Sequence, residues 1–442
     1  MAFINKGNFN DAKKELLNDK NNSVIKVYDE VNKIKGPLSN VIFTLKDVFA
    51  TIDSPTTSSS NILQGFKPHY NAEAFQKLIN AGATVVAKVF CDELAMAGTG
   101  TYSNSGIITN PLDKERLVGG SSSGSASTFT KNIGFSLGSD TGDSVRLPAS
   151  YVGKVGFKPS YGAVSRWGLF AYATSLDTVG WFTHNINDSY EIAKVLYQKD
   201  EKDLTSIELE INNIVEVKPQ VVSYLDCFDY LDENVAKEYL KFINKLKLDN
   251  IILKKIELNI DLLNGIKPVY DIISFSEASS NLANLTGVHF GRRIEGKDWE
   301  DTFTKTRTEG FGFMVQRRLA LGSFYLEKEN QEDLFLRAQK IRRLISNWFT
   351  KIHEESDVFI FPSSHGIAPL IKDLENSSNN FMSWILTHSN LVGNPSINFK
   401  LGENNKMPFN ISVDSKIYTD KKLFSHALYL EKLWKVEGNK ND

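Results

Sequence analysis

The chain is poor in cysteine: Cys91 and Cys227 are the only two among 442 residues. Two cysteines are too few for a disulfide framework or for a metal site built from cysteine, and they fit a reducing compartment. We expect both to be buried side chains, and we expect the protein to be cytoplasmic.

Histidine is also scarce, with seven residues in the chain. Five of these, His289, His353, His365, His388 and His426, are scattered and show no spacing typical of a metal site. We expect them at the surface or with satisfied hydrogen bonds, and we expect no metal site.

Long apolar runs are absent too, so no segment is predicted to span a membrane, and the first residues lack the pattern of a signal peptide. The net charge is −2, which gives no overall electrostatic reason for direct binding to nucleic acid. With 41% hydrophobic and 24% charged residues, the composition is that of a globular protein with a large core.

Serine and glycine are concentrated in two short segments, G-G-S-S-S-G-S at 119–125 and S-D-T-G-D-S-V-R at 139–146. Small residues let backbone amides approach a ligand closely, while several hydroxyl groups share the same space. This composition is typical of an acyl-transfer site. No histidine lies near either segment, so a Ser-His-Asp arrangement would need a distant one.

The order of predicted elements favours an α/β fold with a mixed or parallel sheet. Strands are predicted at 41–45, 84–90 and 135–137, and helices at 72–83 and 123–131. The first of these strands ends at a lysine, Lys46, which is unusual enough to suggest a function.

The remaining segments are less regular. Residues 11–35 have roughly helical spacing, and residues 269–353 are mainly helical, as is 421–436. Residues 207–259 form either an inserted α/β lobe or the far half of the same sheet. We find no repeat and no long linker, so we expect one unit.

A serine hydroxyl needs a base to become a good nucleophile, and Lys46 is the attractive substitute for histidine. A lysine acts as a base only when neutral, so its pKa must fall from about 10.4 to about 7 or 8, which costs on the order of 4 kcal/mol. Burial at a strand end among Phe43, Leu45 and Val48 could supply that desolvation.

These pieces, in this order, resemble the amidase signature family. The resemblance implies a central mixed sheet with helices on both faces, forming a single domain over 1–442. Within it, 1–40 is a divergent helical segment, 41–200 the signature core, and 201–442 the rest of the sheet and a helical substrate-binding part.

The same resemblance implies a Ser-Ser-Lys mechanism. Ser144 is then the nucleophile, Ser121 a bridging serine that follows a cis peptide bond, and Lys46 the base that receives the proton. The backbone amides of Thr141, Gly142, Asp143 and Ser144 would form an oxyanion hole, in which one donor is worth about 3 to 4 kcal/mol.

Segments beginning at Glu277, Gly287, Arg307 and Arg317 resemble the A subunits of bacterial tRNA-dependent amidotransferases. This resemblance implies that glutamine is hydrolysed and that ammonia passes to a partner. The partners are the B and C subunits of a heterotrimer, with ATP, Mg²⁺ and most contacts to the mischarged tRNA at the B subunit. No cofactor is expected in this chain.

Glutamine selection in such subunits implies Tyr270 and Arg318 as substrate contacts, the latter suited to a forked grip on the α-carboxylate. The aspartate that would hold the α-ammonium aligns with Trp384. A tryptophan face can hold an ammonium by a cation–π contact of about 0.5 to 2 kcal/mol, so Trp384 is a further candidate contact.

Asp143 departs from the family pattern, in which glycine precedes the nucleophile. A carboxylate roughly 5 Å from a developing oxyanion opposes it by about 3 kcal/mol at an effective dielectric constant near 20. We expect slow catalysis unless the side chain points away or is paired.

Three functions remain open from the sequence. The principal one is the glutamine-hydrolysing subunit. Trp384 favours a free-standing amidase of altered specificity instead. Asp143 and Trp384 together favour a catalytically impaired subunit that serves as a structural partner. The choice between glutamyl-tRNA and aspartyl-tRNA lies with partners and is not encoded here.

Overall fold

The computed structural model describes residues 2–376 and 380–438. Within them, eleven strands form one sheet in the order β1-β3-β2-β4-β6-β5-β10-β11-β9-β7-β8. The strands are β1 (Val24–Val27), β2 (Ile42–Lys46), β3 (Thr84–Val89), β4 (Phe135–Asp140), β5 (Val155–Lys158), β6 (Thr178–Thr183), β7 (Val221–Leu225), β8 (Ile252–Ile256), β9 (Val358–Pro362), β10 (Ser396–Asn404) and β11 (Met407–Asp414).

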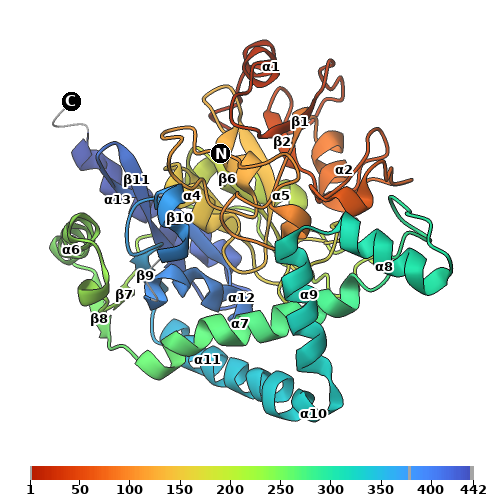
Figure 1. The fold of residues 1–442 in the computed structure, drawn as a ribbon. Coiled ribbons are helices and arrows are strands. Elements are labelled where there is room, and N and C mark those ends of the chain that lie inside the picture. Colours follow the sequence, from red (N-terminus) through yellow and green to blue (C-terminus); the bar gives the residue numbers. More distant parts are fainter. Residues whose placement is uncertain (1, 377–379, 439–442) are drawn as a thin grey trace.

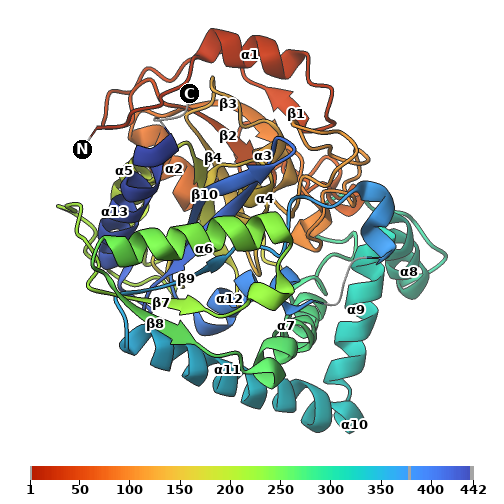
Figure 2. The ribbon, with the colours of Figure 1, turned by 90° about the vertical axis from the view of Figure 1, so that its left-hand side faces the viewer.

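Helices cover both faces of this sheet (Figure 1). They are α1 (Phe9–Leu17), α2 (Glu73–Asn80), α3 (Ser123–Ser127), α4 (Arg146–Tyr151), α5 (Ile186–Leu196), α6 (Glu233–Leu248), α7 (Ile260–Asn281), α8 (Trp299–Gly310), α9 (Phe313–Leu326), α10 (Lys328–Gln331), α11 (Arg337–Glu354), α12 (His388–Val392) and α13 (Asp420–Gly438). The long helices α7, α9 and α11 lie together at one end of the molecule, green to cyan in Figures 1 and 2.

The sheet is mixed, which confirms the predicted α/β class. Strand β2 runs parallel to β3 and β4, and β7 runs parallel to β8 and β9, whereas β4 through β11 include antiparallel pairs. Because β7 and β8 form the far edge of the same sheet, residues 207–259 belong to its far half and are not an inserted lobe.

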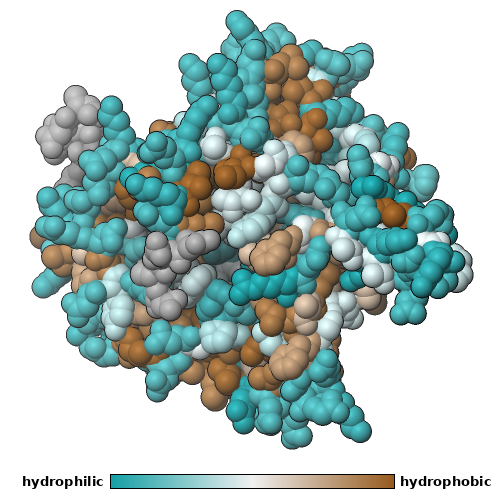
Figure 3. Space-filling model, in the orientation of Figure 1, coloured by the Kyte–Doolittle hydropathy of each residue, from teal (hydrophilic) through white to brown (hydrophobic). Residues whose placement is uncertain are grey.

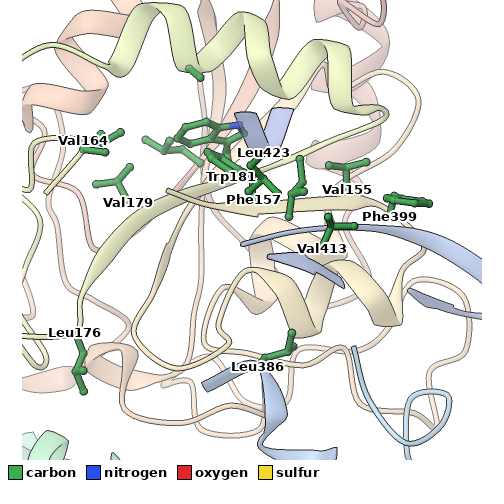
Figure 4. Packing of buried hydrophobic residues seen from close by; sticks show 14 of the residues in the cluster. Val155, Phe157, Val164, Leu176, Val179, Trp181, Leu386, Phe399, Val413 and Leu423 are labelled. Atoms are coloured by element: carbon green, nitrogen blue, oxygen red, sulfur yellow. The ribbon is translucent and has the colours of Figure 1, made fainter. Parts of the chain in front are cut away.

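The two faces of the sheet bury different side chains, because successive residues of a strand point in opposite directions. On β6, Trp181 joins the larger hydrophobic cluster and Phe182 joins the smaller one beneath α3. Figure 4 shows Trp181 and Phe157 packed between the strands and helix α5, with Leu423 of α13 beside them. Most strand residues between β2 and β6 are buried on both faces, as a covered sheet requires.

The helical interpretation of residues 11–35 is wrong beyond Leu17. Helix α1 ends there, the turn that follows contains Asn22 at φ +56°, and Val24–Val27 then pairs antiparallel with the outer edge of β3. Asparagine readily adopts left-handed backbone, and β-branched residues favour strands. Residues 24–27 therefore form a strand because the outer edge of β3 is available for pairing.

The expectation for the histidines is wrong for His353 of α11, which is buried and whose Nε2 has no hydrogen-bond partner among the described residues. His388 of α12 is also buried, but its Nδ1 contacts the Ile385 carbonyl oxygen and its Nε2 lies 3.0 Å from Asp414 Oδ2. Sequence spacing could not reveal this, because the two residues come together only through the packing of α11 against α12.

No helix within the described residues is long and apolar enough to cross a membrane. Hydrophilic side chains cover most of the face seen in Figure 3, with scattered apolar patches between them. Both cysteines are free and buried, as predicted.

Candidate active site

Lys46 is the last residue of β2, and the two-residue period of the strand fixes its direction. It points to the same face as Ile42, which belongs to the hydrophobic cluster that also contains Ala126 of α3. The serine-rich turn that opens α3 therefore lies next to Lys46. The lysine and this turn are in contact although they are far apart in the sequence.

The Lys46 ammonium is completely buried and contacts only hydroxyl groups. Its Nζ lies 2.8 Å from Ser121 Oγ, 3.1 Å from Ser122 Oγ and 2.9 Å from Ser139 Oγ. Burial lowers the pKa of Lys46 to about 8, although Cys91 and nearby carboxylates act in the opposite direction. The group can therefore be neutral near physiological pH and accept a proton.

The backbone of Ser121 is fixed by its neighbours. The Gly120–Ser121 peptide bond is cis, as the family resemblance implies, and the Asp92 amide donates to the Ser121 carbonyl at 3.1 Å. On β4, a Cβ at Gly138 would lie 2.8 Å from Ser122 Oγ, so only glycine leaves room for the loop. Strand β4 and the serine-rich loop are thus closely packed against each other.

A buried ion pair fixes the second serine segment. The Arg146 guanidinium donates to both carboxylate oxygens of Asp140, with Nη2 2.8 Å from Oδ1 and Nε 3.1 Å from Oδ2. Although burial acts to raise the pKa of Asp140, the arginine holds it below its ordinary value. The same carboxylate accepts the Val145 amide at 3.0 Å, which closes the turn around Ser144.

Inside this turn, four backbone amides have no acceptor among the described residues: those of Thr141, Gly142, Asp143 and Ser144. Free N–H groups gathered at one turn can stabilise an oxyanion. The side chain of Thr141 is itself held, because its hydroxyl donates to Asp177 Oδ1 at 2.7 Å. Burial raises the pKa of Asp177 to about 6, so it remains a carboxylate at neutral pH.

Ser144 is brought next to the serine loop through its backbone. Its carbonyl accepts the Ser122 amide at 3.2 Å. Among the described residues, the Ser144 hydroxyl makes no hydrogen bond. The structure therefore contains the hydrogen bond between Lys46 and Ser121 and lacks one between the hydroxyls of Ser121 and Ser144. Catalytic hydrogen bonds often tighten only when substrate is bound.

Asp143 is half-buried beside this turn. Burial and the neighbouring Asp140 raise its pKa to about 7, against the attraction of Arg146, Lys267 and Arg318. About half of the side chains are therefore uncharged at neutral pH. The predicted repulsion of an oxyanion is correspondingly weaker than for a permanently ionised carboxylate.

Tyr270 and Arg318 lie together at one side of the turn, although they come from α7 and α9. A Cβ at Gly142 would lie 3.1 Å from Tyr270 Cζ, so the tyrosine ring packs directly on the glycine. Arg318 Nη1 donates to the Tyr172 hydroxyl at 3.0 Å, while its buried Nε has no partner among the described residues. That Nε is available to a ligand carboxylate.

Trp384 lies near α7, and its ring already faces a cation. The Lys267 ammonium is 4.9 Å from the centre of the Trp384 ring, and it is also paired with Asp271. The aromatic face suggested for a substrate ammonium is thus covered by a lysine of the chain itself.

Sequence reasoning missed four residues of this site. They are Ser122 and Ser139, which bind Lys46, and Arg146 and Asp177, which hold the turn. Arginine six residues after an aspartate in a glycine-rich turn was a usable signal, since a buried arginine needs a carboxylate. Asp177 offered none, because its role depends on a contact across 36 residues.

A buried lysine, adjacent serines and a turn of free amides define an amide-cleaving enzyme of the serine-lysine type. A family model described as Amidase matches residues 11–424. The chain therefore belongs to the amidase family and is an amidase signature enzyme.

Curated relatives are more specific in their names. The chain is 34% identical to the A subunit of the glutamyl-tRNA(Gln) amidotransferase of Mycoplasma pneumoniae, over 92% of this chain and 88% of that protein. It is 36% identical to the protein of the same name from Sulfurimonas denitrificans, over 95% and 96%.

Solved structures agree on the fold. The A subunit of the glutamyl-tRNA(Gln) amidotransferase from Thermotoga maritima is 28% identical and matches with a TM-score of 0.78, over 97% of this chain and 95% of that one. The peptide amidase of Stenotrophomonas maltophilia matches with a TM-score of 0.79 at 19% identity, over 97% and 92%. The fold is thus shared by enzymes with different names.

The protonation of Lys46 gives the first prediction. Amide hydrolysis should rise with pH through about 8, because only neutral Lys46 can accept the proton. Lys46→Arg keeps a charge and donors but cannot deprotonate, so it should lose activity by about 10³-fold, as should Lys46→Ala. Steady-state hydrolysis against pH measures both. Lys46→Arg that is well folded by circular dichroism and keeps more than about a tenth of the activity would contradict a base role.

The second prediction concerns Asp143. Asp143→Asn should change hydrolysis little at about pH 6 and accelerate it increasingly above pH 7, where the native carboxylate ionises. The gain should reach at most about 100-fold, the equivalent of about 3 kcal/mol. Paired pH–rate profiles test this, with the exposed Asp229→Asn as control. A gain that is independent of pH would exclude the charge as its cause.

Proposed function

We propose that this chain is the glutaminase subunit of a tRNA-dependent amidotransferase. Ser144 attacks the side-chain amide of glutamine, Ser121 passes the proton to Lys46, and the amides of residues 141–144 stabilise the oxyanion. The observation that carries this assignment is the fully buried Lys46 bound to Ser121 at 2.8 Å, in a chain similar over most of its length to named A subunits.

The substrate contacts follow from the geometry around α7 and α9. Arg318, with its unpartnered Nε, binds the α-carboxylate, and the Tyr270 ring packs beside it on Gly142. Burial raises the pKa of the Tyr270 hydroxyl well above its ordinary value, so the hydroxyl stays a donor. Together these groups select a substrate that carries a carboxylate as well as the reacting amide.

The ammonia released passes to the partner subunits, and at the B subunit ATP and Mg²⁺ would supply the activation of the carboxylate of glutamyl-tRNA or aspartyl-tRNA. Support for such partners comes from the helical end of the molecule. Large apolar side chains are exposed there on α9 and α11, including Phe313 and Leu344, and Trp299 is exposed on α8. Exposed aromatic residues of this kind are enriched in protein interfaces.

Assembly with the two partners allows a decisive test of the assignment. Ser144→Ala should abolish glutamine-dependent amidation of tRNA and leave ammonia-dependent amidation unchanged, because only the first needs the nucleophile. Both rates are measured on the same purified complex. If a correctly assembled complex loses both activities, Ser144 is not a glutaminase nucleophile. If the wild-type complex uses only ammonia, the chain is an impaired structural subunit.

The contact of Lys267 with Trp384 favours one alternative, a free-standing amidase of altered specificity. A cation of the chain occupies the aromatic face, and a substrate ammonium close to it would be repelled. An amide that carries a carboxylate and no α-ammonium would avoid this cost.

Glutamine and glutaramate separate the two functions, since they share the amide and the carboxylate and differ in the α-ammonium. For a glutaminase subunit we expect kcat/KM for glutamine to exceed that for glutaramate by about 10-fold or more, equivalent to about 1.4 kcal/mol. A preference for glutaramate, by a chain that purifies without partners, would establish the free-standing amidase.

The exposed face of α9 gives a prediction about assembly. Phe313→Asp should weaken binding of the partner subunits by about 10-fold or more, because it puts a charge into an apolar contact, and should leave glutamine hydrolysis by the free chain unchanged. Titration of labelled partners measures the affinity. Leu248→Asp, equally exposed on α6, is the matched control. Equal effects of the two variants would remove α9 from the interface.

A further inference from the structure

Three side chains from three elements meet in the interior, away from the serine-lysine site. They are His353 of α11, His388 at the start of α12, and Asp414 at the end of β11. One ligand atom from each lies within 4.8 Å of the others, and the residues are 5%, 0% and 0% exposed. Two imidazoles and a carboxylate so deeply buried need electrostatic compensation.

The hydrogen bonds of His388 settle its tautomer. Its Nδ1 lies 2.5 Å from the Ile385 carbonyl oxygen, and because a carbonyl only accepts, Nδ1 carries the hydrogen. In the neutral ring, Nε2 then carries no hydrogen and presents its lone pair. That lone pair faces Asp414 Oδ2 at 3.0 Å, so two acceptors point at each other.

One proton would not satisfy the cluster. Placed on His388 Nε2, it would serve a single oxygen of Asp414. His353 Nε2 and Asp414 Oδ1 would remain buried, and neither has a hydrogen-bond partner among the described residues. A metal cation accepts an electron pair from each of the three side chains at once and neutralises the carboxylate.

We propose that His353, His388 and Asp414 bind a divalent transition metal, with Zn²⁺ the best match to imidazole nitrogen and carboxylate oxygen. Ligands around tetrahedral zinc are about 3.3 Å apart, so a contraction on the order of 1 Å closes the set. The site is structural, because its ligands are shielded from substrate.

The groups behind the ligands fit this role. The Ile385 carbonyl orients His388, and Asn394 Nδ2 donates to Asp414 Oδ2 at 3.0 Å, contacts of the kind that orient metal ligands. The Phe349 ring stacks on His388 with centroids 3.8 Å apart, which fixes the imidazole.

Metal content tests the proposal directly. The full chain, produced in zinc-supplemented medium without a polyhistidine tag and dialysed, should retain about one Zn²⁺ per chain by mass spectrometry. His353→Gln and His388→Gln should each hold less than about a tenth of an equivalent. His289→Gln, at an exposed position, should retain the full equivalent.

The wild-type chain keeps the proposal testable even if these variants fold poorly. Stripping the metal with a chelator should lower the midpoint of thermal unfolding by a few degrees, and added Zn²⁺ should restore it. Co²⁺ in place of Zn²⁺ should give the visible absorption of a tetrahedral site. A folded wild-type chain with no bound zinc, and no shift of its midpoint on addition of Zn²⁺, would show instead that the trio is a protonated hydrogen-bond network.

Discussion

The buried guanidinium of Arg146 is the constraint on which the rest of the site depends. A buried guanidinium needs a hydrogen-bond acceptor for each of its donors. Removing one partner of a buried ion pair lowers the free energy of unfolding by about 3 to 5 kcal/mol. Its acceptors are Asp140, the Gly142 and Leu386 carbonyls, Ser389, Asn390 and, more distantly, Ser396. They come from β4, the turn at residues 141–144, the 3₁₀ turn Ile385–Thr387, α12 and the start of β10. One side chain therefore fixes the turn that carries Ser144 relative to segments more than 200 residues away.

The same rule, applied to lysine, explains why Lys46 can be neutral near physiological pH. Three lysines are fully buried among the described residues. Lys88 has a carboxylate partner, Asp47, at 3.0 Å, whereas Lys158 donates to carbonyl oxygens and Lys46 to hydroxyls alone. Without an adjacent countercharge, burial lowers the pKa of Lys46 by an amount equivalent to about 3 kcal/mol. The pKa of Lys158 is lowered as well, to about 7, but its ammonium contacts carbonyl oxygens in place of serine hydroxyls.

The sequence predicted those parts of the site that depend on short-range patterns. A strand that ends at Lys46 and a loop of small residues at Ser121 are legible because strand period and turn chemistry are local. The acceptors of Arg146 on α12 could not be predicted from the sequence, since they depend on how distant elements pack. The same holds for Val24–Val27, whose strand exists because β3 offers a free edge, and for Lys267, whose position over Trp384 arises from the approach of a separate loop.

Helix α12 connects two buried polar groups, the histidine-aspartate cluster and the guanidinium of Arg146 with its acceptors. It has five residues, too few to be stable alone, so its position is set by what it touches. His388 belongs to the histidine-aspartate cluster, and the next two residues, Ser389 and Asn390, are acceptors of Arg146. Because protein interiors are close-packed, whatever fixes the His388 ring also fixes the acceptors one and two residues later. The cluster therefore helps to hold the turn at residues 141–144 through the acceptors of Arg146.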